Sequence, residues 1–170
     1  MNVYLKEVES ISNNKSLTKF FVAAALFFIW VTVQGALQAQ QPVHEFLEQG
    51  PAGIIVGAHT YIGLLGWVSL TLMGVLYYLV PLVSGNPLSW PRLVNWVFWI
   101  ETITIALNAV LMIGAGISGG TAFQAGRVAE LDTILAPFMI PISLFSIVCG
   151  LTAIAFAVQI IHTAAKRSVS

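Results

Sequence analysis

The residue that most suggests chemistry in this sequence is His59, because it stands inside a long apolar run. The run covers residues 54–83 and is long enough to cross a bilayer. An ionisable ring at membrane depth needs a partner or a ligand, and such residues often mark a functional site. The first question about function is therefore what the imidazole of His59 binds.

Small residues share a helical face with His59. Steps of three and four residues along the chain lead to Gly63, Gly66, Leu70 and Gly74. Glycine inside a helix costs about 1 kcal/mol relative to alanine, so three glycines on one stripe indicate a packing demand. In a membrane such a face admits a neighbouring helix or a planar cofactor. An imidazole beside a smooth surface suits an iron porphyrin, and the residues alone leave both interpretations open.

Two more polar side chains fall inside the third apolar run. Glu101 is the only acid within an expected span and lies near its middle, where a carboxylic acid is costly and is often protonated or paired. We interpret it as a proton relay or partner contact, or as a protonated acid hydrogen-bonded to Thr102, Thr104 or Ser69. Asn108 falls two turns further along, nearer the expected depth of His59. It would orient the imidazole, bind a heme propionate or bridge two helices.

The remaining candidates are two histidines, an arginine and a cysteine. His44 stands in the first external loop, where it is either a second iron ligand or a solvated loop residue. His162 falls near the opposite membrane face from His59, too far away for both to hold one iron. Arg127 would pair with a heme propionate or with nearby acids. The single cysteine, Cys149, lacks metal-ligand spacing and is expected to be a packing residue.

Composition places these residues in a membrane. The chain has 170 residues, of which 58% are apolar and 8% charged, whereas soluble domains carry about 25% charged residues. Its formal net charge is zero, so we expect no nucleic-acid partner. The apolar runs lack the alternation of barrel strands. The sequence therefore predicts an all-α, four-helix transmembrane bundle with spans at 20–38, 54–83, 92–117 and 134–163.

Basic residues set the expected orientation. Four crossings place six of them on one side of the membrane: Lys6, Lys15, Lys19, Arg92, Lys166 and Arg167. Only Arg127 falls on the other side, so the positive-inside rule puts both termini in the cytoplasm. We divide the chain into a cytoplasmic segment 1–19, a membrane domain 20–163 and a cytoplasmic tail 164–170. The expected location is the inner or cell membrane of a bacterium or archaeon.

A family resemblance rests on the second and third spans. The stretch AHTYIGLLGWVSLTLMGVLYYLVP, residues 58–81, is similar to the second helix of the catalytic subunit of heme-copper oxidases. The likeness is greatest to C-type oxidases and cytochrome-c-dependent nitric oxide reductases. The third span, with its Phe98–Trp99 pair, resembles the next helix of that subunit. Short stand-alone relatives would carry His-x-His in the second helix, and Tyr61 replaces the second histidine here. The likeness covers roughly residues 54–120.

The resemblance implies a cofactor and a set of ligands. In the full-length family the second-helix histidine is an axial ligand of the low-spin heme, and His59 matches it in motif and in expected depth. The implied cofactor is heme b. The residues expected to contact the cofactor or its iron are His59, Gly63, Gly66, Asn108, Arg127 and His44. The copper ligands and the other low-spin ligand come from later helices of the family, so we expect no copper and no catalysis by this chain alone.

Three functional hypotheses follow. The first is a b-type heme subunit that transfers electrons in a membrane redox complex of the cytochrome oxidase or nitric oxide reductase type. The second is a heme-free membrane scaffold or assembly subunit. The third is a channel or transporter that uses Glu101, although four helices without a broken pair suit transport poorly. The expected partners are membrane lipid, a second copy of the chain or other membrane redox subunits, with a cytochrome c among the candidates.

Overall fold

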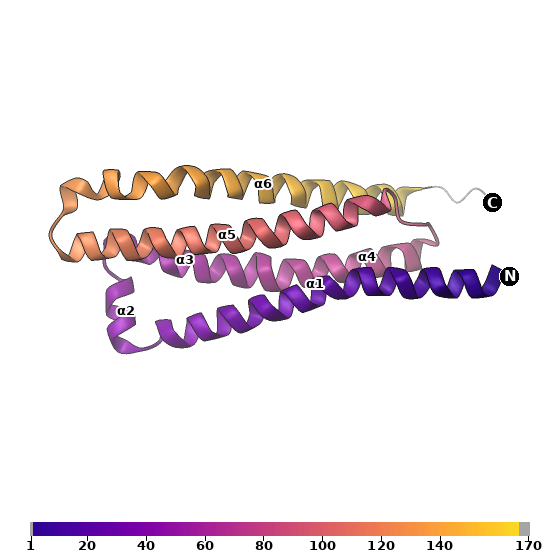
Figure 1. Ribbon diagram of the computed structural model, residues 1–170, viewed down its shortest axis with the longest axis horizontal. Helices are drawn as coiled ribbons and strands as arrows, with labels where there is room; N and C mark the ends of the chain where they lie inside the picture. The colour runs from indigo at the N-terminus through magenta and orange to yellow at the C-terminus, as the bar shows by residue number, and fades with distance from the viewer. Residues whose placement is uncertain (1, 167–170) are drawn as a thin grey trace.

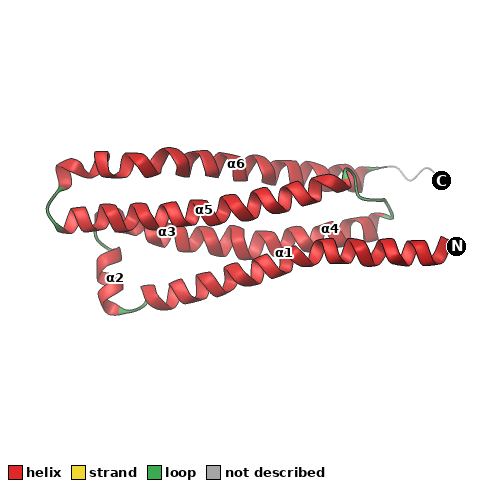
Figure 2. Cartoon of the chain, in the orientation of Figure 1, coloured by secondary structure: helices red, strands yellow, loops and turns green. Residues whose placement is uncertain are grey.

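The computed structural model describes residues 2–166, with side chains described from residue 16 onward. Every element in this range is helical (Figures 1 and 2). In chain order the elements are α1 (Asn2–Gln38), α2 (Gln41–Leu47), η1 (Gly50–Gly53), α3 (Ile54–Tyr61), η2 (Ile62–Ser69), α4 (Leu70–Ser84), α5 (Pro91–Gln124), η3 (Val128–Glu130) and α6 (Leu131–Ala165). Three of these are not α-helices: η1 and η3 are short 3₁₀ turns, and η2 is a π-helix that joins α3 to α4.

Four helical segments are long and apolar enough to cross a membrane, which confirms the predicted all-α arrangement. They are Ser16–Gln38, Gly50–Ser84, Pro91–Gln124 and Val128–Ala165. The third helix continues to Gln124, beyond the predicted end at 117, because its later glycines pack against another element. A Cβ at Gly119 would lie 2.7 Å from the Pro51 Cβ, and one at Gly120 would lie 2.7 Å from the Ala52 Cβ. These glycines serve close helix packing rather than a loop.

The helices form a bundle in which the start of α1 and the end of α6 lie on the same side (Figure 1). The short helix α2 crosses the opposite end, where it links α1 to the α3–η2–α4 segment. Arg92 lies at the start of α5 and Lys166 follows α6, while Lys19 donates from Nζ to Asn95 Oδ1 in the first turns of α5 at 2.6 Å. Arg127 follows α5 at the other end of that helix. The side chains of Lys6 and Lys15, which also entered the predicted orientation, lie outside the described residues. Arg167 and the rest of the chain after residue 166 lie outside them as well.

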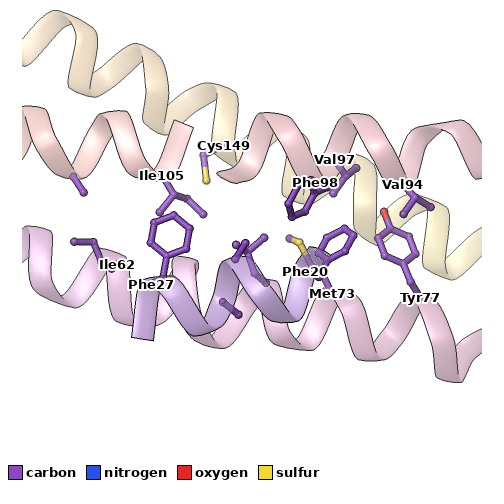
Figure 3. Packing of buried hydrophobic residues seen from close by; sticks show 14 of the residues in the cluster. Phe20, Phe27, Ile62, Met73, Tyr77, Val94, Val97, Phe98, Ile105 and Cys149 are labelled. Carbon is purple, nitrogen blue, oxygen red and sulfur yellow. The ribbon is translucent and has the colours of Figure 1, made fainter. Parts of the chain in front are cut away.

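Aromatic rings fill the bundle centre between α1, α4 and α5 (Figure 3). Phe20 is fully buried, and its ring centroid lies 5.0 Å from that of Phe98 and 5.6 Å from that of Tyr77. Edge-on and tilted pairs at these separations contribute beyond simple burial. The pairs therefore fix how α1 sits against the rest of the bundle.

A buried polar network holds the connection between α4 and α5 against α6. The Gln159 side chain is fully buried, and its Oε1 accepts a hydrogen bond from the Tyr77 hydroxyl at 2.9 Å. Its Nε2 donates to the backbone carbonyls of Ser89 at 2.6 Å and Trp90 at 3.0 Å. Trp90 has left-handed backbone angles (φ 48°, ψ 63°), which are unfavourable for a bulky residue. The amide of Gln159 thus forms hydrogen bonds with one hydroxyl and two carbonyl groups around a strained turn.

We expect Gln159→Ala to destabilise the bundle by about 2 kcal/mol or more. The substitution leaves one hydroxyl and two carbonyls without their partner, and each buried unsatisfied group costs about 1–3 kcal/mol. The measurement is the free energy of unfolding in detergent micelles. Ile161→Ala is the matched control, because Ile161 lies on the same helix and is 65% exposed. Equal losses in both variants would show that the network contributes nothing specific.

Candidate functional site

His59 lies near the end of α3 and turns its ring toward α1. A Cβ built on Gly35 would lie 2.9 Å from the His59 Cε1, so the imidazole rests directly against the backbone of α1. The ring is half-buried, and its Nδ1 is buried without a hydrogen-bond partner among the described residues. A buried polar atom of this kind is costly unless something binds it. No hydrogen bond within the described residues therefore satisfies this nitrogen.

An open groove of about 570 Å³ runs beside this ring between α1 and the α3–η2 segment. The volume falls within the range of small-molecule and cofactor sites, about 300–1,000 Å³. Small and apolar side chains dominate the walls. The lining residues are Val31, Thr32, Gly35, Ala36, His59, Thr60, Gly63, Leu64, Trp67 and Val68. The groove offers an imidazole within an apolar surface, which is the chemistry of a porphyrin site.

The glycine stripe below His59 divides between the two predicted roles. Gly63 lines the groove, although a Cβ there would already lie 3.3 Å from Val31. Gly66 packs against α1, since a Cβ there would lie 2.6 Å from the Phe27 ring. Gly74 packs against α1 in the same way, next to Phe20. The lower part of the stripe therefore serves helix packing, and only its upper part faces open space.

The π-helix η2 begins three residues after His59 and shapes the wall of the groove. Its Ser69 hydroxyl donates to the Leu64 carbonyl at 2.9 Å, five residues back, in keeping with the wider turn. Short π-helical segments inside α-helices are rare and occur frequently at functional sites. A count of 3.6 residues per turn from His59 does not hold through this segment, so the predicted stripe is only approximate.

The structure does not bring the other predicted contacts into the groove. Asn108 is buried on α5 and donates from Nδ2 to the Ser146 hydroxyl on α6 at 3.0 Å. It is thus an interhelical contact, which was one of its predicted roles. Its possible role as a heme contact rests on the sequence alone.

Two predicted residues lie on the surface and pair with acids. The exposed His44 of α2 places its Nε2 3.3 Å from Glu48 Oε1, and the exposed Arg127 lies 3.6 Å from Glu130 Oε2. Both arrangements match the solvated alternatives considered for these residues. His44 as an iron ligand and Arg127 as a propionate partner stay predictions.

The third histidine is engaged at the other end of the bundle. His162 Nδ1 lies 2.9 Å from the Ser89 hydroxyl, and its ring stacks on Trp90 with centroids 4.6 Å apart. Among the described residues no group of three or more histidines, cysteines or acids is placed to hold a metal ion. The other two histidines contact other side chains: His44 pairs with Glu48, and His162 contacts Ser89.

Glu101 has a different partner from those expected. It is 2% exposed, and its Oε2 accepts a hydrogen bond from the Cys149 thiol of α6 at 2.8 Å. The Thr104 and Ser69 hydroxyls, named above as possible partners, instead donate to backbone carbonyls of their own helices. The sequence offered no signal for this pair, because it depends on the register between two helices that the chain order does not reveal.

The family of the chain follows from its sequence similarity to known proteins. The family described as cytochrome c and quinol oxidase polypeptide I matches residues 8–169. The chain belongs to this family. The match confirms the resemblance to heme-copper oxidase subunit I and covers all four spans rather than the second and third alone.

Three curated relatives of the chain come from bacteria. A cytochrome c oxidase subunit 1 homolog of Agrobacterium tumefaciens (strain T37) is 30% identical over 102 residues, which are 59% of this chain and 18% of that protein. The Cbb3-type cytochrome c oxidase subunit CcoN1 of Stutzerimonas stutzeri is 31% identical over 110 residues, 64% of this chain and 23% of that protein. Cytochrome c oxidase subunit 1 of Rhodobacter capsulatus is 41% identical over 87 residues, 47% of this chain and 16% of that protein. The chain spans about a fifth of the length of these relatives.

Proposed function

We propose that this family member binds heme b at His59 and serves as an electron-transfer subunit of a membrane redox complex. The observation that carries the proposal is the unpartnered imidazole beside an open groove of about 570 Å³. Family membership supports the choice of heme over other planar ligands. Heme, when bound, supplies a one-electron redox centre, and a histidine is among its usual iron ligands.

The chain's own residues would divide the work of binding. His59 would coordinate the iron through its imidazole. Gly35 leaves its face of α1 bare beside the ring, and Gly63 does the same on the facing helix. Leu64 and Trp67 supply apolar walls that limit access of water. The second axial position would be filled by a second copy of the chain or another subunit, or left open.

The remaining parts of the proposal concern orientation and partners. The excess of basic residues at one end supports a cytoplasmic location for both termini in an inner or cell membrane. The partners proposed are membrane lipid and a second copy or other redox subunits, with a cytochrome c as a candidate electron donor. Catalysis would belong to the complex rather than to this chain alone.

The direct test is purification of the full chain from cells supplied with heme. We expect a coloured protein whose extracted cofactor gives the pyridine hemochrome spectrum of heme b. Electron paramagnetic resonance of the oxidised protein then separates a low-spin, six-coordinate iron from a high-spin, five-coordinate one. A colourless preparation that is fully helical and membrane-inserted would support the heme-free scaffold instead.

Gly35→Val should weaken heme binding without removing the ligand. The added Cβ would lie 2.9 Å from His59 Cε1, and the rest of the side chain would enter the groove. We expect a lower heme content at equal yield, measured as the ratio of Soret to protein absorbance. Ala25→Val is the control, since Ala25 is exposed on α1 and does not line the groove. Unchanged heme content in Gly35→Val would place the cofactor elsewhere.

A further inference from the structure

A second cavity lies on the other side of the α3–η2 segment from the groove. It measures about 180 Å³, is partly open, and is lined by residues of α3, η2, α4, α5 and α6. None of its lining residues is shared with the groove beside His59. Most of its wall is apolar, but polar side chains gather in it: Tyr61, Ser69, Glu101, Ser146 and Cys149. The proposed heme site does not use this cavity.

Buried polar oxygens in and beside this cavity have no hydrogen-bond partner. Glu101 Oε1 and the Tyr61 hydroxyl belong to lining residues and are both unpaired. Asn108 Oδ1 is also unpaired, and the same side chain donates to Ser146, which lines the cavity. The Tyr61 hydroxyl lies within interaction range of Asn108, Cys149 and Glu101, which places these groups together.

An unpaired carboxyl oxygen such as Glu101 Oε1 would be expensive in a dry cavity. An unsatisfied buried polar group is strongly unfavourable, and cavities that stay empty are apolar ones. A buried water makes about three hydrogen bonds, and its share of liquid volume is about 30 Å³. The volume of the cavity therefore admits several waters. Water also has the required chemistry, because it can donate to Glu101 Oε1 and accept from the Tyr61 hydroxyl, both of which belong to lining residues.

We propose that this cavity holds ordered water and that Glu101 exchanges its proton through it. The step is an acid dissociation: the carboxyl O–H bond breaks, the proton passes to a cavity water to give hydronium, and the return transfer restores the acid. The Cys149 thiol donates to Oε2. It exchanges its own proton for one from the same water, so that it is again a thiol after each exchange. The site is thus a hydrated carboxylic acid within the membrane-spanning bundle. It does not depend on heme binding.

The Cys149 thiol is a natural probe of this site. It is the only cysteine of the chain, so the S–H stretching band in an infrared spectrum belongs to it alone. On transfer of the full-length protein in detergent to D₂O, we expect the band to move to the S–D position within minutes. The carboxylic acid band of Glu101 should shift in the same time and should be missing in Glu101→Gln. That variant should also move the S–H band, because the hydrogen bond from Cys149 then meets an amide.

Blocking the cavity tests whether exchange uses this route. A Cβ on Gly150 would meet no atom within 4 Å, so Gly150→Leu can place a side chain at the lining without a clash. We expect S–D formation to slow from minutes toward the hours typical of exchange by local opening of the protein. Leu151→Ala is the control, being 61% exposed and outside the cavity. Ala153→Leu, at another lining position, replaces the first variant if that one does not fold.

Each outcome of the exchange experiment decides the proposal. Fast exchange in the unmodified protein that slows in the blocked variant supports hydration through the cavity. An S–H band that persists for hours in the unmodified protein shows a dry cavity and overturns the proposal. Exchange that stays fast in the blocked variant shows that protons arrive by another route, which overturns it as well.

Discussion

His59→Ala is expected to yield a folded membrane protein without heme. The imidazole is the only histidine side chain among the residues lining the groove, and the other two histidines contact Glu48 and Ser89 instead. Iron that is coordinated by a single side chain of the protein loses its bond to the protein when that side chain is removed. The expected result is loss of Soret absorbance to the background level at unchanged yield and unchanged helix content by circular dichroism.

Two further variants separate ligand loss from a general packing defect. His59→Gly leaves a hole that free imidazole can enter, so imidazole added to the buffer should restore part of the absorbance. His162→Ala removes a histidine that contacts Ser89 and Trp90 at the other end of the bundle, and it should keep full heme content. If His59→Ala retains its heme, the iron is held elsewhere and the proposed function is wrong for this groove.

His44→Ala addresses the second axial position. The residue is exposed and pairs with Glu48, so we expect no change in the spin state of the iron. A conversion from low spin to high spin in this variant would instead show that α2 supplies the second ligand. The comparison is made on the oxidised protein by electron paramagnetic resonance.

The fold was largely predictable because apolar length is a strong signal. Four runs long enough to cross a bilayer lead directly to four helices, and no tertiary contact is needed to find them. The end of α5 was not predictable on the same basis. Glycines after residue 113 indicate a loop in a soluble protein, yet here they allow η1 and α3 to approach closely. Similarly, nothing in the local sequence distinguishes the π-helix η2 from an ordinary helix.

The candidate site was predictable only in part, for a physical reason that differs by residue. His59 was found because an imidazole inside an apolar run is unusual. Gly35 was missed because its relevance arises from the packing of α1 against α3. That packing produces no periodic pattern in the sequence. The contact between Glu101 and Cys149 joins positions 48 residues apart on two helices. The spacing of residues along one helix does not reveal how that helix is aligned against its neighbour.

We expect Gly116→Ala to lower the stability of the bundle, because α3 and α5 approach closely at this residue. A Cβ at Gly116 would lie 2.4 Å from the Ile55 Cγ1 and 3.1 Å from the Ile55 backbone nitrogen. The side chain can rotate, but the backbone nitrogen moves only if the helices separate. Overpacking of this kind typically costs about 1–3 kcal/mol. We therefore expect a lower free energy of unfolding, measured by titration with a denaturing detergent in mixed micelles.

Gly150→Ala is the matched control, because it makes the same chemical change where a Cβ meets no atom within 4 Å. Alanine is a better helix former than glycine by about 1 kcal/mol, so this variant should be neutral or more stable. Opposite signs at two glycines of one bundle cannot come from helix propensity and must reflect the space around each. Ile55→Ala in the Gly116→Ala background should recover part of the loss, which gives a coupling energy for the pair. Equal stability of the two glycine variants would mean that α3 and α5 do not pack as closely as the structure places them. The α3–η2 segment forms one wall of the groove beside His59, so the shape of the groove would then differ as well.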